Sequence, residues 1–575
     1  MKRWVLLSGI VVLGIAAVVV SERQKVDVSA SPAAVLYLVA DTEQELTRMP
    51  VHFTRMSDDE EIRIGDELAR VYAGSRSDEN KAPSTLAVER YLNQVGGPLA
   101  LRAHRRLPYR FHYIPGQYLV NAFALPGGHV YVGGGLLALM DSEDELANVI
   151  GHEIEHVDHY HCAERAQQEE ALRKIPLGGL VAIPIAVFEA GYSKDQELEA
   201  DREGTRLAVE AGYSPNGAIR MFEAFERLYR QYQSDQARAK TPQEEVSRLT
   251  LETLEGYFRS HPLPSERIAQ IQKLIASEGW PVRSERELAV AYIFWTVRAQ
   301  TALDGKKYQE AERLAQQSLK MHPDQPEAWD VLAQAQFAQT KFAEAATSYR
   351  KLLESNPRND PKKLTSVAAY AMALAAADRS TGAAEFRSWL ESLQSAKPRN
   401  AEVEQAGLSL LAGDPAPAHK LEEELQLRSD SHTPDYIGEL GWWYYLAGDY
   451  PRASQLLADA AQQRPGDAKL WVRRAWAEIE IHRYSDAIQT VNSGMYEERL
   501  RGERSMAQGV AFWQAQEHEE ALSNCDRAVA FQPEWQNPAW VKALYSPLVA
   551  QSVQEMYAER ERQKKERIAV NPVPR

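Results

Sequence analysis

The chain has 575 residues, which is enough for two or more domains with cores of their own. Its 66 Lys and Arg residues face 81 Asp and Glu residues, and this net charge of −15, with no evident basic face, argues against nucleic-acid binding. The two cysteines, Cys162 and Cys525, fall in different predicted domains, which excludes a disulfide framework. We expect both to be packed thiols.

The N-terminus has the charge layout of an exported protein. Lys2 and Arg3 precede an uncharged apolar run that extends to Val20, longer than a usual signal-peptide core and at the lower limit for a membrane span. Residues 1–21 are therefore a cleaved signal peptide or an uncleaved membrane anchor, and both alternatives stay open. In either case the positive end stays inside and the rest is exported. Residues 22–55 show no clear period and are interpreted as a linker.

A mixed α and β pattern follows, from which we predict one domain over residues 56–285. Residues 57–74 are amphipathic and predict a scaffold helix, and a second helix is expected over residues 86–95. Residues 111–114 and 130–132 have the composition of strands. As a bare pattern, the stretch between them would be part of an ordinary hairpin.

The pattern with the clearest chemistry is HEIEH at residues 152–156. Ser142 and Glu145 have the spacing of a capping box and predict a helix start just before it. His152 and His156 would then project from one face of the helix, one turn apart, as two ligands of a zinc ion. Glu153 would take a proton from a zinc-bound water. The alternative is a solvated helix with two incidental histidines.

The third ligand distinguishes these alternatives. His159 and Cys162 occupy the glycine and third-histidine positions of the metzincin pattern, which therefore fails. Further along, Glu197 and Asp201 share one helical face. Glu197 would complete a His, His, Glu site with an open position for water, and Asp201 would accept the N–H of a liganding imidazole. Without the HEIEH pattern this segment would be only a charged solvated helix.

Four segments in order carry a resemblance to a known family. They are NAFALPGGHVYVGGGLL (residues 121–137), HEIEH (152–156), ELEAD (197–201) and HPLPSER (261–267). Over about residues 56–275 the chain resembles the zinc endopeptidases related to CAAX prenyl proteases and HtpX. This resemblance implies a zincin-like metallopeptidase domain with a small β-sheet and one Zn²⁺ per chain. With the repeats described below it resembles a periplasmic subgroup, which implies a place in the bacterial cell envelope, facing the periplasm.

The resemblance also implies roles for individual residues. It implies a substrate-binding edge strand made of Asn121, Ala122, Phe123 and Ala124. It makes His261 a fourth ligand or a gate of the zinc, and it allows Asp201 a proton-donor role. One departure is Lys194, where family members often have Arg, which puts in doubt a bidentate Arg contact there.

Two further features near the site are less specific. Residues 175–188 are apolar but broken by Pro and Gly, so they are either a lid over the cleft or simple core packing. His159 continues the face of His152 and His156, but it is one more turn away and too far to join the same ion. We expect it at the surface or behind a ligand.

From about residue 286 the pattern changes to a period of 34 residues. Aromatic or histidine anchors recur at Tyr308, Phe342, Tyr450, Tyr484 and His518, with an alanine three residues after each. The gap of 108 residues between Phe342 and Tyr450 has room for two degenerate units, near Thr381 and Pro415. This pattern is typical of tetratricopeptide repeats and predicts an all-α solenoid of about seven units over residues 286–556, followed by a charged tail over 557–575.

The combined interpretation is a mainly α (α+β) protein that acts as an exported zinc metalloendopeptidase. By analogy its substrates would be misfolded or stalled envelope proteins, including outer-membrane β-barrel precursors, with the repeats docking substrates or assembly proteins. The N-terminus would contact the membrane if it stays uncleaved. The rival interpretation is a chaperone-like adaptor with a gated or silent zinc site.

Overall fold

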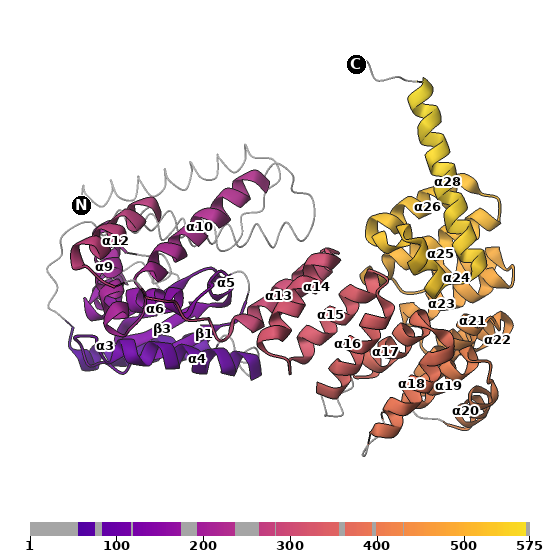
Figure 1. The fold of residues 1–575 in the computed structure, drawn as a ribbon, viewed down its shortest axis with the longest axis horizontal. Helices are drawn as coiled ribbons and strands as arrows, with labels where there is room; N and C mark the ends of the chain where they lie inside the picture. Colours follow the sequence, from indigo (N-terminus) through magenta and orange to yellow (C-terminus); the bar gives the residue numbers. More distant parts are fainter. Residues whose placement is uncertain are drawn as a thin grey trace. The chain divides into compact units, whose positions relative to one another are not determined.

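The computed structural model describes residues 56–74, 83–116, 119–173, 192–235, 264–281, 283–355, 363–393, 398, 400–428 and 431–570. The predicted signal or anchor segment, the linker, the apolar run 175–188 and His261 lie outside the described residues. The chain divides into two compact units, Met1–Phe294 and Trp295–Arg575 (Figure 1). Among the helices that could be described, none combines the length and the apolarity needed to cross a membrane.

The first unit builds a small mixed sheet between helices. Its elements begin with α3 (Asp58–Gly74), α4 (Pro83–Ala100), β1 (Arg110–Ile114), β2 (Ala122–Leu125), β3 (His129–Gly133) and α5 (Gly134–Leu137). The strand order is β1-β3-β2, with β1 parallel and β2 antiparallel to the central β3. The strand β2, in which the predicted substrate-binding residues fall, therefore forms one edge of the sheet. Asn121 lies just before it.

The remaining helices of this unit supply the site. They are α6 (Glu143–Asp158), α7 (His161–Arg173), α9 (Lys194–Glu210), α10 (Asn216–Asp235) and α12 (Pro264–Glu278). The start of α6 is fixed by its cap, because the Glu145 backbone N–H donates to the Ser142 hydroxyl at 3.2 Å. Buried Asp144 accepts hydrogen bonds from the backbone N–H groups of Ser214 and Arg286, at 2.6 and 2.7 Å. The loops around α6 are thus tied to its first turn.

The second unit is an array of helix pairs (Figure 1). The pairs are α13 (Ala291–Asp304) with α14 (Tyr308–Met321), α15 (Pro326–Ala338) with α16 (Phe342–Ser355), α17 (Lys363–Ala377) with α18 (Arg379–Ser392), α19 (Ala401–Leu411) with α20 (Ala416–Leu427), α21 (Thr433–Ala447) with α22 (Tyr450–Gln463), α23 (Ala468–Glu480) with α24 (Tyr484–Ser493), α25 (Arg501–Gln514) with α26 (His518–Phe531) and α27 (Pro538–Leu544) with α28 (Pro547–Val570). Each predicted aromatic or histidine anchor is the first residue of a second helix. The alanines three residues on are all buried, so neighbouring helices can approach closely.

The mainly α fold with a small sheet and a solenoid is confirmed. The two intervening units near Thr381 and Pro415 are present as α17–α18 and α19–α20. The helix α28 continues through the predicted tail as far as Val570. Both cysteines are buried and free, Cys162 in the first unit and Cys525 in the second.

Candidate metal centre

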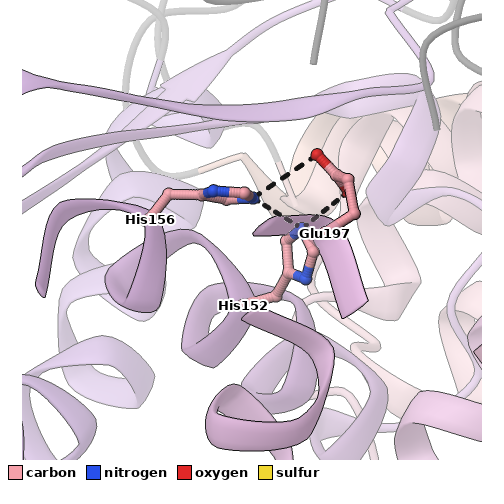
Figure 2. A group of neighbouring side chains, drawn as sticks. All are labelled: His152, His156 and Glu197. Carbon is pink, nitrogen blue, oxygen red and sulfur yellow. Dashed lines mark hydrogen bonds and ion pairs between the residues drawn. The ribbon is translucent and has the colours of Figure 1, made fainter. Parts of the chain in front are cut away.

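Three side chains with metal-binding atoms converge in the first unit. His152 and His156 come from α6 and Glu197 from α9, and all three are buried (Figure 2). The Nε2 atoms of the two histidines lie 3.1 Å apart. One oxygen of Glu197 lies 3.5 Å from His152 Nε2, and the other lies 3.6 Å from His156 Nε2. Within the described part of the chain, this is the one group of three or more such side chains that could hold a metal ion.

The set fits a zinc-like ion. Two donors bound tetrahedrally at zinc–ligand distances of roughly 2.0–2.1 Å are about 3.4 Å apart, close to the separations found here. Two imidazoles and one carboxylate are donors that zinc prefers, and three protein ligands leave a fourth position open. Burial opposes the charge of His152, yet the carboxylates of Asp201 and Glu197 raise its pKa to about 10. The protein surroundings thus favour positive charge at this point.

Two glycines allow the helices that carry the ligands to cross closely. A Cβ atom added to Gly151 on α6 would lie 2.6 Å from the carbonyl oxygen of Gly204 on α9. A Cβ added to Gly204 would lie 2.5 Å from the backbone nitrogen of His152. Because real Cβ atoms do not approach backbone this closely, only glycine fits at both positions. The crossing point is next to the first ligand, so it sets the distance between His152 and Glu197.

Behind His152 lies an ion pair that holds the ring. Asp201 Oδ1 is 2.9 Å from His152 Nδ1, and Arg267 donates to both oxygens of Asp201 at 2.5 and 2.6 Å. Both partners of the pair are almost fully buried, and the Arg267 guanidinium stacks on the Phe222 ring at 4.2 Å. Burial opposes ionisation of Asp201, but Arg267 and His152 hold its pKa below the usual range. An ionised Asp201 orients His152 and has no proton to donate.

Glu153 lies beside the ligands in a dry environment. It is 7% exposed, and burial raises its pKa to about 7. It also bonds to the backbone of Ala124, on the edge strand β2. A carboxylate with this pKa can both accept and release a proton near neutral pH. The predicted base and the predicted substrate strand are therefore adjacent.

A cavity opens next to His152 and Glu153. Its lining includes Asn121 and Ala122 at the start of the edge strand, together with Asp201, Thr205 and Arg267. Its apolar wall is made of Leu136, Val149, Ala218, Met221, Phe222 and Phe225. An apolar cavity with a few convergent polar groups is typical of a binding site.

Parts of the chain match known protein families. Residues 87–275 match peptidase family M48, and residues 296–362 and 444–508 match tetratricopeptide repeats. The first unit contains an M48 peptidase domain. The repeats follow it along the chain.

Relatives of the chain carry protease names. A beta-barrel assembly-enhancing protease of Escherichia coli is 25% identical over 355 residues, covering 52% of this chain and 68% of the relative. A related Vibrio cholerae protein is 27% identical over 307 residues, covering 46% of this chain and 61% of the relative. A mitochondrial metalloendopeptidase of Arabidopsis thaliana is 36% identical over 118 residues, covering 19% of this chain and 24% of the relative. The matches thus span no more than about two thirds of these relatives.

His156, the second histidine of the candidate metal centre, is surrounded by different residues from those around His152. The Nδ1 atom of His156 lies 3.0 Å from Nδ1 of His161, and the Tyr192 ring stacks on His156 with centroids 4.0 Å apart. The Tyr192 hydroxyl lies 3.1 Å from the sulfur of Cys162, which is fully buried as a packed thiol. Tyr192 also donates its backbone N–H to Glu197 at 3.2 Å. One aromatic residue therefore touches two ligands.

For three further residues near the site, only the structure shows what they contact. Arg267 ends the HPLPSER segment, but its position in the sequence does not predict its bond to Asp201, 66 residues away. The exposed Lys194 pairs with Glu266 at 2.7 Å and takes no part in the metal centre. His159 lies 3.1 Å from Glu155, away from the three ligands, as its distance along the helix predicted.

Proposed function

We propose that the chain is a zinc-dependent metalloendopeptidase. The observation that carries the proposal is the meeting of two imidazole nitrogens and one carboxylate beside a buried glutamate. The M48 match and the protease names of the relatives support it. His152, His156 and Glu197 would hold the zinc ion.

Different residues of the chain would have different roles in peptide hydrolysis. A bound zinc ion supplies a Lewis acid that polarises the peptide carbonyl and acidifies water. Glu153, with its raised pKa, takes a proton from the attacking water and passes it to the leaving amine. Asp201 keeps the proton of His152 on Nδ1, so that Nε2 stays available to the metal. The edge strand at Ala122–Ala124 would pair with extended substrate through its backbone.

The substrate and location are further parts of the proposal. The apolar N-terminal run behind Lys2 and Arg3 supports export to the cell envelope, on the periplasmic side in a bacterium. The bacterial relative is named for enhancing β-barrel assembly. We propose that the chain cleaves misfolded or stalled envelope proteins, including outer-membrane β-barrel precursors. The solenoid would dock these substrates or their assembly partners.

The test is hydrolysis of casein by the full chain, with bound zinc measured in the same sample. We expect about one zinc per chain and cleavage that a chelator stops. Glu153→Gln should keep the zinc and lower kcat by at least about 100-fold, because the general base is lost. Cleavage by Glu153→Gln at the wild-type rate would exclude the proposed mechanism.

A second variant, His261→Ala, tests the gate implied by the family resemblance. If only this variant cleaves casein, the chain is a gated protease. If zinc is absent, or if every variant is inert with zinc bound, the chaperone-like adaptor is the better account.

A further inference from the structure

The two histidines of the metal centre are supported in different ways. His152 Nδ1 faces a carboxylate directly, at 2.9 Å from Asp201. His156 Nδ1 instead faces another imidazole, at 3.0 Å from His161 Nδ1. His161 is 4% exposed, so its ring is held in the protein and not in solvent.

The positions of the protons follow from the contacts. Nε2 of His156 points at the other two ligands, so it must offer its lone pair to the metal and the proton must sit on Nδ1. At 3.0 Å, His156 Nδ1–H then donates to Nδ1 of His161. The proton of His161 therefore lies on Nε2, which is 3.5 Å from a carboxylate oxygen of Glu199. Both ligands are thus backed by a carboxylate of α9, one directly and one through an imidazole.

The turn before His161 directs the chain so that His161 lies beside His156. Tyr160, the second of the two residues between α6 and α7, has φ of 65°, in the left-handed region. A bulky residue in this conformation is strained and persists only where its surroundings hold it. The Arg105 guanidinium lies 3.7 Å over the Tyr160 ring and is itself paired with buried Glu61 at 2.5 Å. This arrangement holds the turn that starts α7 at His161.

We propose that His161 is a positioning residue for the metal ligand His156. Glu199 in turn accepts the Nε2–H of His161. The inference rests on the proposed zinc site and names a residue that acts through a ligand without touching the metal. His161 fixes the tautomer and the rotation of the His156 ring, while Tyr192 fixes the plane of that ring by stacking on it.

The experiment measures zinc affinity of the full chain by competition with a chelator. His161→Leu removes the acceptor, and we expect zinc to bind about 10–100-fold more weakly. His161→Asn keeps an acceptor oxygen near the position of Nδ1 and should stay within about 3-fold of wild type. The control is His159→Leu, two residues away. His159 pairs with Glu155 at 3.1 Å, and its Nδ1 lies 3.7 Å from Glu199, beyond hydrogen-bond distance. This variant should bind zinc like the wild type.

A second readout separates positioning from folding. In the cobalt-substituted chain, the visible absorption of Co²⁺ reports the ligand geometry. We expect a changed spectrum in His161→Leu, a restored one in His161→Asn and no change in His159→Leu. If His161→Leu keeps both wild-type affinity and the wild-type spectrum, or if His161→Asn is as weak as His161→Leu, the inference is wrong.

The outcomes also distinguish this inference from the proposed function. A wild type that binds zinc tightly but cleaves no protein contradicts the proposed function, and the comparison of the His161 variants still decides the inference. A wild type that cleaves protein, with no difference in zinc affinity or cobalt spectrum among the variants, contradicts the inference alone. A wild type that binds no zinc overturns both.

Discussion

Two carboxylates beside the same histidine illustrate how single residues acquire different roles. Burial raises the pKa of Glu153 to about 7. Burial also acts against ionisation of Asp201, but the bidentate bond from Arg267 lowers its pKa instead. One carboxylate can therefore move protons near neutral pH, and the other stays charged and holds a ring.

Arg267→Met tests the cost of leaving Asp201 without its cation. We expect the free energy of unfolding of the first unit to fall by about 3–5 kcal/mol, because a buried charge loses its partner. Urea unfolding of the full chain, followed by a probe in the first unit, measures this. Arg206→Met is the control, since Arg206 on α9 forms partly exposed pairs with Glu203 and Glu278, and its loss should cost about 1 kcal/mol or less. An Arg267→Met variant as stable as the control would show that the buried pair contributes little.

At the scale of elements, the crossing of α6 and α9 determines whether the ligands meet. The helix spacing within HEIEH brings His152 and His156 together, but Glu197 arrives from another helix. The close approach at Gly151 and Gly204 is what brings that helix near enough. Glycine is needed at both positions because it has no Cβ atom to separate the two helices.

Gly204→Ala is expected to separate the two helices. Its Cβ would lie 2.5 Å from the His152 nitrogen, so α9 must shift and carry Glu197 away. We expect a stability loss of about 1–3 kcal/mol and a zinc affinity at least about 10-fold lower. Thermal unfolding and chelator competition measure the two effects.

The control for this variant is Gly97→Ala on α4. A Cβ at Gly97 would meet nothing within 4 Å. Pro98 follows directly and opposes a Cβ on the residue before it, so we expect the free energy of unfolding to change by less than about 1 kcal/mol and zinc binding to stay unchanged. Wild-type zinc affinity in Gly204→Ala would refute the role of the crossing.

At the scale of the whole molecule, the two units have cores of different kinds. The first is packed around a polar centre, and the second is an array whose stability depends on contacts between neighbouring repeats. A buried polar group lies within that array. Trp443 donates to Glu404, which is 1% exposed, at 2.9 Å. The pKa of Glu404 is raised, first by burial and then by the nearby carboxylate of Glu439.

Glu404 predicts a pH dependence of solenoid stability. In the folded chain the pKa of Glu404 is above its ordinary value of 4.5. At a pH between 4.5 and the folded pKa, the folded chain therefore keeps a proton that the unfolded chain has lost. The free energy of unfolding must therefore fall as pH rises through this window. Glu404→Gln removes the ionisation, keeps an acceptor for Trp443 and should be about 1–2 kcal/mol more stable than wild type at pH 8, with little difference at pH 5.

Urea unfolding of the second unit at both pH values measures this effect. Glu402→Gln on the same helix is the control. Because Glu402 is 64% exposed, its substitution should not change how the free energy of unfolding varies with pH. A Glu404→Gln variant with the wild-type pH dependence would contradict the prediction.

The sequence alone determined the features that depend on local spacing. His152 and His156 share a face because a helix has 3.6 residues per turn, and the recurring anchors fix the repeat units because each unit is one helix pair. Contacts between residues far apart in the chain are not predicted by local spacing. The family resemblance included Arg267 in a motif, but only packing placed it against Asp201, 66 residues away.

The tertiary structure decided which histidine supports the second ligand. Extending the helical period past His156 points to His159, and that extension assumes an unbroken helix. The helix α6 ends at Asp158, and the left-handed Tyr160 turns the chain before α7 begins. His161 therefore returns to His156, while His159 pairs with Glu155. A period holds only as far as the helix that produces it, and where this helix stops depends on the contacts of Tyr160 with the rest of the fold.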